Sequence, residues 1–191
     1  MNFLRRIQYN SPVVLTFALL SLGALLLNYL TGGYTNLMFF SVYRSSPLSL
    51  GYWIRLVGHV LGHANWEHYA NNMLLFLILG PMLEEKYKSR SLILMIVIVA
   101  VVTGLLNNLL FPTILLGASG VVFMAIILSS VTGVEEGRIP LTLIIVAAIY
   151  IGQEVAAGLF TQDNISHITH IAGGICGGAF GLFTNRLGIK Q

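Results

Sequence analysis

The sequence predicts an all-α integral membrane protein in which six helices form one compact bundle. Of its 191 residues 56% are hydrophobic and only 9% are charged, and the mean hydropathy is +0.83. Soluble domains carry about 25% charged residues, so this composition favours a membrane protein. Apolar runs of helix length recur along the chain between short polar turns, without a repeat or low-complexity segment. The net charge of +3 is small and scattered, which argues against a nucleic-acid partner.

The first helix is predicted over residues 13–30, an apolar run of 18 residues that is long enough to span a bilayer. A cleaved signal peptide is the alternative, but its apolar region would be overlong and no convincing cleavage site follows. We therefore expect a retained helix. The connection over residues 31–64 is long and carries Tyr and Trp side chains, so we expect part of it to lie in the outer leaflet.

Five further helices are predicted from the remaining apolar runs. They cover residues 66–86, 92–110, 119–133, 141–160 and 167–187. Glu84 and Glu85 stand beside basic residues at the end of the second helix, most simply as a solvated charged turn, with a cap to a neighbouring helix as the alternative. Glu154 falls within the fifth helix, and an acid inside a membrane helix is a functional candidate by default.

Six helices place both chain termini on one side of the membrane. The ends and loops on that side hold eight basic residues, against two on the other side. The eight are Arg5, Arg6, Lys86, Lys88, Arg90, Arg138, Arg186 and Lys190, and the two are Arg44 and Arg55. The positive-inside rule then predicts cytoplasmic termini, with the Ser119 end of the fourth helix facing outward. By analogy, this minimal layout favours a bacterial plasma membrane.

Ser119 begins an unusually short helix. Fifteen residues span roughly 22 Å, whereas the hydrocarbon core is about 30 Å thick. Ser119 is therefore expected below the outer boundary of the membrane. A serine at a helix start is usually a cap, but five histidines are predicted at the same level. Because ionisable residues in spanning segments are costly and usually functional, they favour catalysis.

Two chemistries fit a serine among histidines. His59 and His63 have a spacing that suits a metal if they are helical, but no HExxH motif is present. The other hypothesis is nucleophilic catalysis, in which a histidine removes the proton of Ser119. His68 and Asn72 lie four residues apart on one helix face and can donate to an oxyanion, as can the Ser119 amide. No acid lies beside His167 or His170, so a dyad fits better than a triad.

Several short motifs carry a resemblance to a known family. Gly117-Ala118-Ser119-Gly120 resembles the GxSG motif of rhomboid intramembrane serine proteases, and His68-x-x-x-Asn72 resembles their HxxxN motif. The segment from His170 through Gly173 to Gly177 is similar to their HxxGxxxG motif. Trp53-Ile54-Arg55 resembles the WR motif of the first loop, with Ile54 between residues that are adjacent in the family. The resemblance covers nearly the whole chain.

The resemblance implies a role for each matched residue. Ser119 is the nucleophile and His170 the general base, and His68, Asn72 and the Ser119 backbone stabilise the oxyanion. The residues expected to support the site are Gly117, Gly120, Phe123, Gly173 and Gly177, with Phe123 where members often carry Tyr. His59 and His63 are expected to be structural.

The same resemblance implies partners and leaves one alternative function open. The expected substrates are proteins with a transmembrane helix, cut within the lipid bilayer near the outer face without a metal or organic cofactor. The alternative is a catalytically silent rhomboid-like protein that binds membrane helices. A transporter is disfavoured because no internal repeat is found. The sequence does not indicate an oligomeric state.

Overall fold

The computed structural model describes residues 8–131, 141–142, 144–145, 148–149, 152 and 164–186. Within these ranges all regular elements are helical, and the one strand-type contact is an isolated antiparallel bridge between Val42 and Leu115. The predicted all-α class is confirmed for this part of the chain. Most of the predicted fifth helix, including Glu154, lies outside the described residues, so that element stays a prediction.

The helices follow the predicted apolar runs, with one difference in the middle of the chain. They are α1 (Pro12–Leu30), α2 (Tyr34–Phe39), α3 (Leu50–Gly58), the 3-10 turn η2 (His59–Leu61), α4 (Trp66–Leu110), α5 (Ser119–Val131) and α7 (Asn164–Arg186). Lys88 interrupts α4 with φ 66° and ψ 153°, so this element consists of two helices joined at a sharp kink. The chain therefore reverses at one residue, where the sequence suggested a turn of several. By length and composition, α1 and α4 are apolar enough to cross a membrane, and α5 is a shorter apolar helix.

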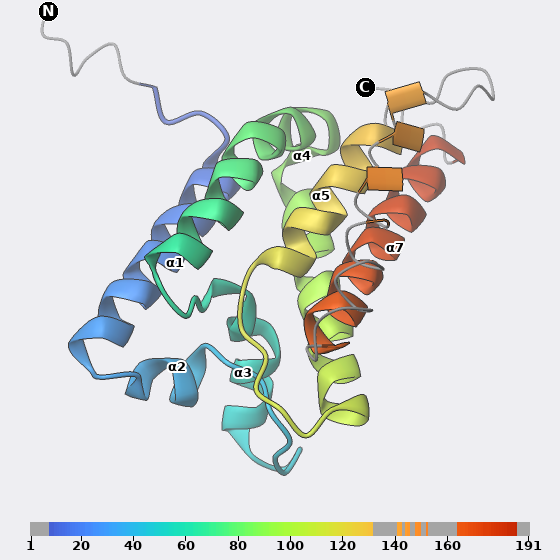
Figure 1. The fold of residues 1–191 in the computed structure, drawn as a ribbon. Helices are drawn as coiled ribbons and strands as arrows, with labels where there is room; N and C mark the ends of the chain where they lie inside the picture. Colours follow the sequence, from blue (N-terminus) through green and yellow to red (C-terminus); the bar gives the residue numbers. More distant parts are fainter. Residues whose placement is uncertain are drawn as a thin grey trace, which may run out of the picture.

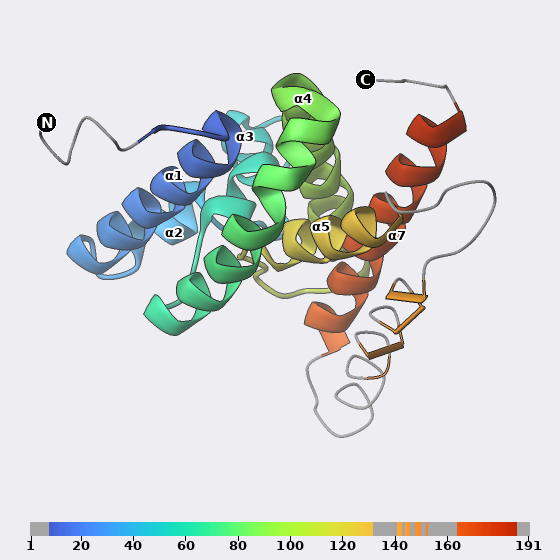
Figure 2. The same ribbon diagram turned by 90° about the horizontal axis from the view of Figure 1, so that it is seen from above.

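Helix α5 lies at the centre of the described bundle, between α4 and α7 (Figure 2). Eight of its thirteen residues are buried, including Met124 and Leu128, because nearly every position on the helix is apolar or small. A helix that is apolar all round must be enclosed by others. The side chains of Phe76, Leu83 and Leu92 from α4 belong to the same buried cluster. This central position places Ser119, the first residue of α5, next to the buried residues Ala118 and Gly120.

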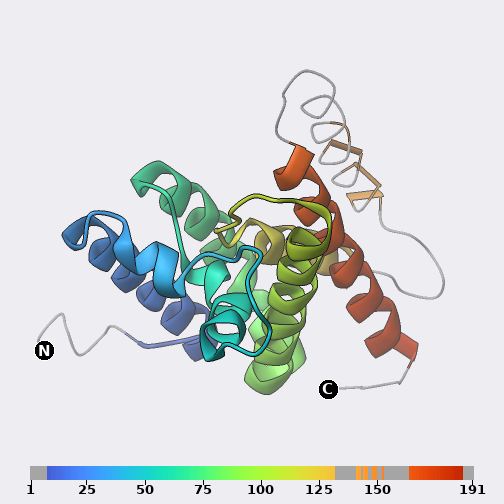
Figure 3. The same cartoon turned by 90° about the horizontal axis from the view of Figure 1, so that it is seen from below.

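The long first connection has structure of its own. Helices α2 and α3 lie across one end of the bundle, and α3 runs beside the second half of α4 (Figure 3). Tyr52 and Leu56 of α3 form a small buried cluster with Val42. Arg44 closes the end of α4, since its guanidinium donates to the carbonyl oxygens of Asn108 at 2.8 Å and Leu109 at 2.9 Å. Cations that bind the last carbonyls of a helix satisfy groups without an intrahelical partner.

Glu84 joins the start of α1 to α4. Its carboxylate is 5% exposed and accepts hydrogen bonds from the amides of Val13 and Val14 at 3.0 to 3.1 Å, and from the Ser89 hydroxyl at 2.7 Å. The N-cap residue of α1, Ser11, makes no side-chain capping bond of its own. Glu84 is therefore a cap for a neighbouring helix, and the interpretation as a solvated residue is wrong for it. Glu85 is exposed.

We expect Glu84→Gln to lower the free energy of unfolding by about 2 kcal/mol, because hydrogen bonds to charged groups contribute about 1.5–3 kcal/mol. The amide keeps one acceptor oxygen and turns its donor nitrogen toward backbone N–H groups. Thermal unfolding of the purified protein in detergent measures the change. The neighbouring Glu85→Gln removes the same charge from an exposed position and should leave the unfolding temperature unchanged. Equal shifts for the two variants would show that charge, and not the cap, matters.

Candidate active site

The segment before α5 carries Ser119 back into the bundle. After α4 ends, the chain runs along the lower part of the molecule and then rises between the helices to the start of α5 (Figure 1). Hydrogen bonds to other segments hold it in place. Leu115 and Val42 exchange two backbone hydrogen bonds of 2.8 and 2.9 Å, Asn107 Nδ2 donates to Thr113 O at 2.9 Å, and Gly117 N donates to His59 O at 2.9 Å. Irregular backbone at membrane depth must be enclosed by protein or line a wet cavity. Gly117 and Ala118, the two residues before Ser119, are buried, whereas Pro112 and Ile114 nearer the end of α4 are exposed. Ser119 itself is partly exposed.

Gly117 lets the ring of His68 approach the serine. Its φ is +132°, a conformation that disfavours residues with a side chain. A Cβ at this position would also lie 2.8 Å from both Cε1 and Nε2 of His68. The tip of the His68 ring therefore rests against the backbone two residues before Ser119. Any larger residue at position 117 would displace the ring or the loop.

Asn72 lies one turn beyond His68 on the same face of α4. It is 7% exposed, and its Nδ2 donates to the carbonyl oxygen of His68 at 3.0 Å. An amide nitrogen carries two N–H groups, and no second acceptor is found for it among the described residues. His68 and Asn72 thus bring donors to one place beside Gly117. The amide of Ser119, the first residue of α5, adds the positive end of a helix dipole.

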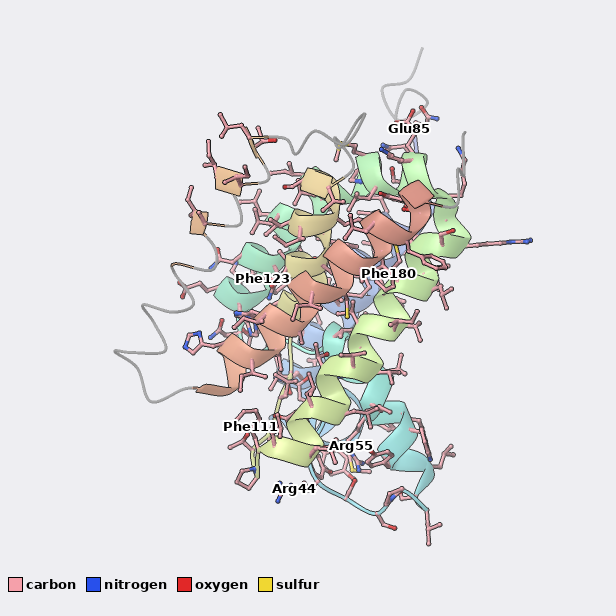
Figure 4. The ribbon with its side chains drawn as sticks, turned by 90° about the vertical axis from the view of Figure 1, so that its right-hand side faces the viewer. Arg44, Arg55, Glu85, Phe111, Phe123 and Phe180 are labelled. Atoms are coloured by element: carbon pink, nitrogen blue, oxygen red, sulfur yellow. The ribbon has the colours of Figure 1, made fainter. Side chains whose placement is uncertain are left out.

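His170 packs against the face of α5 that carries Ser119. The rings of His170 and Phe123 are stacked, with centroids 4.4 Å apart and an interplanar angle of 7°. Phe123 lies one turn after Ser119, so their side chains share a helix face, and helical side chains lean toward the N-terminus. His170 is also near enough to His68 for their charges to interact. The structure therefore brings His170, Ser119 and His68 to one region at the start of α5. Figure 4 labels Phe123, which lies one turn along this helix.

Close packing of α7 on α5 makes this juxtaposition possible. A Cβ at Gly173 would collide with the carbonyl oxygen of Gly120, and a Cβ at Gly177 would collide with that of Met124. At Gly120 a Cβ would meet Thr103 Cγ2 at 3.2 Å and the Thr169 carbonyl oxygen at 3.6 Å. Small residues four apart let helix backbones approach closely, as the sequence suggested. The glycines thus set the distance at which His170 faces α5.

His59 and His63 are buried, at 1% and 0% exposed, beside the residues of the candidate site. Nδ1 of His59 lies 3.1 Å from the Leu56 carbonyl oxygen, and Nε2 lies 3.3 Å from the Thr103 hydroxyl. Burial is the main cause that lowers the pKa of His59 and of His63 to about 4, so both are neutral near pH 7. Among the described residues no group of three or more His, Cys, Asp or Glu side chains could hold a metal ion.

The sequence did not indicate how His68 is held. The ring of His63 meets the ring of His68 edge to face, with centroids 5.0 Å apart, and meets the ring of Tyr69 in the same way at 5.5 Å. His63 itself is anchored by Nδ1, which donates to the Leu61 carbonyl oxygen at 3.1 Å. His63 precedes α4 and His68 lies within it, so helix periodicity does not relate the directions of their side chains. The sequence therefore gives no sign of this contact.

Comparison with known proteins identifies the family. The model of the rhomboid domain matches residues 50–186, which include all the residues of the candidate site. Rhomboid-like protein 11, chloroplastic, from Arabidopsis thaliana is 26% identical over 140 residues, which are 65% of this chain and 50% of that protein. The chain thus spans about half the length of this relative. Because the domain match covers well over half of its residues, the chain belongs to the rhomboid family.

Proposed function

We propose that this chain is an intramembrane serine endopeptidase in which Ser119 is the nucleophile and His170 the general base. The observation that carries the proposal is the stacking of His170 on Phe123, one helical turn from Ser119. That contact supports a position of the imidazole over the face of α5 from which the hydroxyl projects. A serine hydroxyl becomes an effective nucleophile when a base accepts its proton, and neutral histidine is suited to this near pH 7.

The reaction follows the acyl-enzyme route. Ser119 Oγ attacks the carbonyl carbon of the scissile peptide bond while His170 accepts the hydroxyl proton. The oxyanion accepts hydrogen bonds from the amide of Ser119 and from the His68 and Asn72 side chains. His170 then gives its proton to the leaving amine nitrogen, and the C–N bond breaks. Water then attacks the ester carbonyl carbon while His170 accepts its proton. His170 returns this proton to Ser119 Oγ as the ester C–O bond breaks, which releases the acid product and restores the serine hydroxyl.

The finer membrane arrangement belongs to the same proposal. Six spanning helices, with both termini in the cytoplasm, would place Ser119 toward the outer face of the membrane. The sequence predicts this helix over residues 119–133, roughly 22 Å at 1.5 Å per residue, and a helix of that length would start below the membrane boundary. Substrates would be membrane proteins whose spanning helix unwinds near that face, because a helical carbonyl is already hydrogen-bonded. Placement in a bacterial plasma membrane stays a prediction.

Labelling with a fluorophosphonate tests the nucleophile without a known substrate. We expect the folded protein in detergent to gain the mass of one phosphonyl group, located on Ser119 by peptide mass analysis. Ser130, a hydroxyl farther along α5 that bonds to the Ile126 carbonyl oxygen, is the internal control and should remain unmodified. An absence of labelling, together with an absence of cleavage, would support the silent protein that binds membrane helices. Label on Ser130 alone would contradict the assignment.

A further inference from the structure

Arg55 is a buried cation without an acidic partner in the described structure. Its side chain is 7% exposed, although it belongs to the first connection and not to the catalytic residues. Nη2 donates to the Ser45 hydroxyl at 2.7 Å, and the guanidinium lies 4.4 Å from the centroid of the Tyr43 ring. Nε is buried with no hydrogen-bond partner. Burial of a charge without an opposite charge is costly, so this guanidinium is suited to receive an anion.

The unpaired guanidinium points to the first turn of its own helix. A Cβ at Gly51 would lie 3.0 Å from Arg55 Nη1 and 3.4 Å from the Ser49 hydroxyl oxygen, so both groups flank Gly51. Ser49 is the N-cap of α3 but makes no side-chain capping bond. The amides of Leu50 and Gly51 have no intrahelical acceptor at this position. The Ser49 hydroxyl and the Arg55 guanidinium therefore both lie beside Gly51, in the turn of α3 whose first amides have no intrahelical acceptor.

We propose that this start of α3 binds the phosphate of an anionic phospholipid in the leaflet that surrounds α3. Helix N-termini bind phosphate through their free amides and their dipole, and arginine is suited to phosphate because its N–H groups form a planar fork. Here Arg55 supplies the charge, and Ser49 and the amides of Leu50 and Gly51 supply further donors. Figure 4 shows Arg55 at the end of the molecule that also carries Arg44. No acid among the described residues competes for the guanidinium.

The outer surface of α3 indicates a lipid and not a free phosphate ion. Leu50, Trp53, Ile54 and Val57 are exposed, and their spacing places them along one side of the helix. The indole of Trp53 donates to the Pro47 carbonyl oxygen at 2.9 Å, which holds the ring on this surface. In a phospholipid the acyl chains extend from the phosphate headgroup. The apolar face of α3 likewise extends from the proposed phosphate site, so it can contact the acyl chains of the same lipid. Aromatic residues of this kind favour the level of lipid headgroups.

Native mass spectrometry of the full chain in detergent tests the site, with phosphatidylglycerol and phosphatidylcholine as probes. We expect the protein to retain one phosphatidylglycerol at least about tenfold more tightly than phosphatidylcholine. Gly51→Ala should remove this preference, because the added methyl occupies the space beside Nη1 but meets only movable side-chain ends. Arg55→Gln should do the same. Gly23→Ala adds the same methyl where no atom lies within 4 Å, so it should bind as the wild type does.

Each other outcome overturns the proposal. Equal retention of the two lipids by the wild type would show that the start of α3 does not select an anionic headgroup. Loss of the preference in Arg44→Gln, but not in Gly51→Ala, would move the charge requirement to the other arginine of this loop. Displacement of phosphatidylglycerol by millimolar inorganic phosphate would identify a free anion as the ligand. If Arg55→Gln does not fold, Gly51→Ala still decides the matter.

Discussion

Replacement of Ser119 or His170 by alanine is expected to lower cleavage of a membrane substrate by about a thousandfold or more. In the proposed mechanism, Ser119→Ala removes the oxygen that forms the acyl-enzyme, and His170→Ala removes the base that accepts the proton of the hydroxyl. The measurement is cleavage of a model single-span substrate in liposomes. Both variants should unfold at nearly the wild-type temperature, since neither side chain is fully buried. The double variant should lose no more than either single one, because the two groups act as a unit.

Two matched variants separate catalysis from general damage. Ser130→Ala removes a hydroxyl from the same helix, and His167→Ala removes the imidazole one turn before His170. Both are expected to retain most of the activity, because His170 is the proposed base and its ring is stacked on Phe123, one turn from Ser119. Unchanged cleavage in Ser119→Ala would refute the assigned nucleophile. Loss of cleavage in His167→Ala, with activity kept in His170→Ala, would show that His167 and not His170 is the general base.

Many residues of the candidate site could be predicted because they are polar or ionisable within otherwise apolar segments. A serine and several histidines in an apolar chain draw attention, since polar groups in spanning segments are costly. Helix spacing alone places His68 and Asn72 on one face, and the same rule links Ser119 to Phe123. The sequence also predicts which side of α7 packs closely on a neighbouring helix, because glycines recur every four residues on that side. The catalytic roles themselves are still predictions.

The sequence could not reveal contacts that join distant segments. Glu84 binds amides about seventy residues away, and nothing in its neighbourhood distinguishes it from Glu85, which is exposed. Arg44 and Arg55 look alike as isolated cations in one loop, yet one closes the end of α4 while the other is buried against Tyr43. Such differences depend on which way a helix is rotated when it packs. Composition and spacing do not contain that information.

The packing of α7 makes a second large effect expected: Gly173→Ala should reduce cleavage by about tenfold or more and lower stability by about 1–3 kcal/mol. Its Cβ would collide with the Gly120 carbonyl oxygen and approach the Gly120 carbonyl carbon to 2.9 Å. Backbone atoms inside the bundle cannot yield as a side-chain end can, so α7 must move away from α5. His170, one turn before Gly173, would move with it. Activity in liposomes and thermal unfolding measure the two effects.

Gly174→Ala is the control for this prediction because it makes the same change one position along the helix. Among the described residues the added Cβ meets only Cγ1 of the Ile127 side chain, at 3.4 Å, an ordinary van der Waals distance. Both substitutions gain helix propensity, worth about 0.5–1 kcal/mol, so a difference between them measures contact with α5. We expect Gly174→Ala to be active and at least as stable as the wild type. Equal behaviour of the two variants would show that α7 can shift without cost, and that the position of His170 does not depend on Gly173.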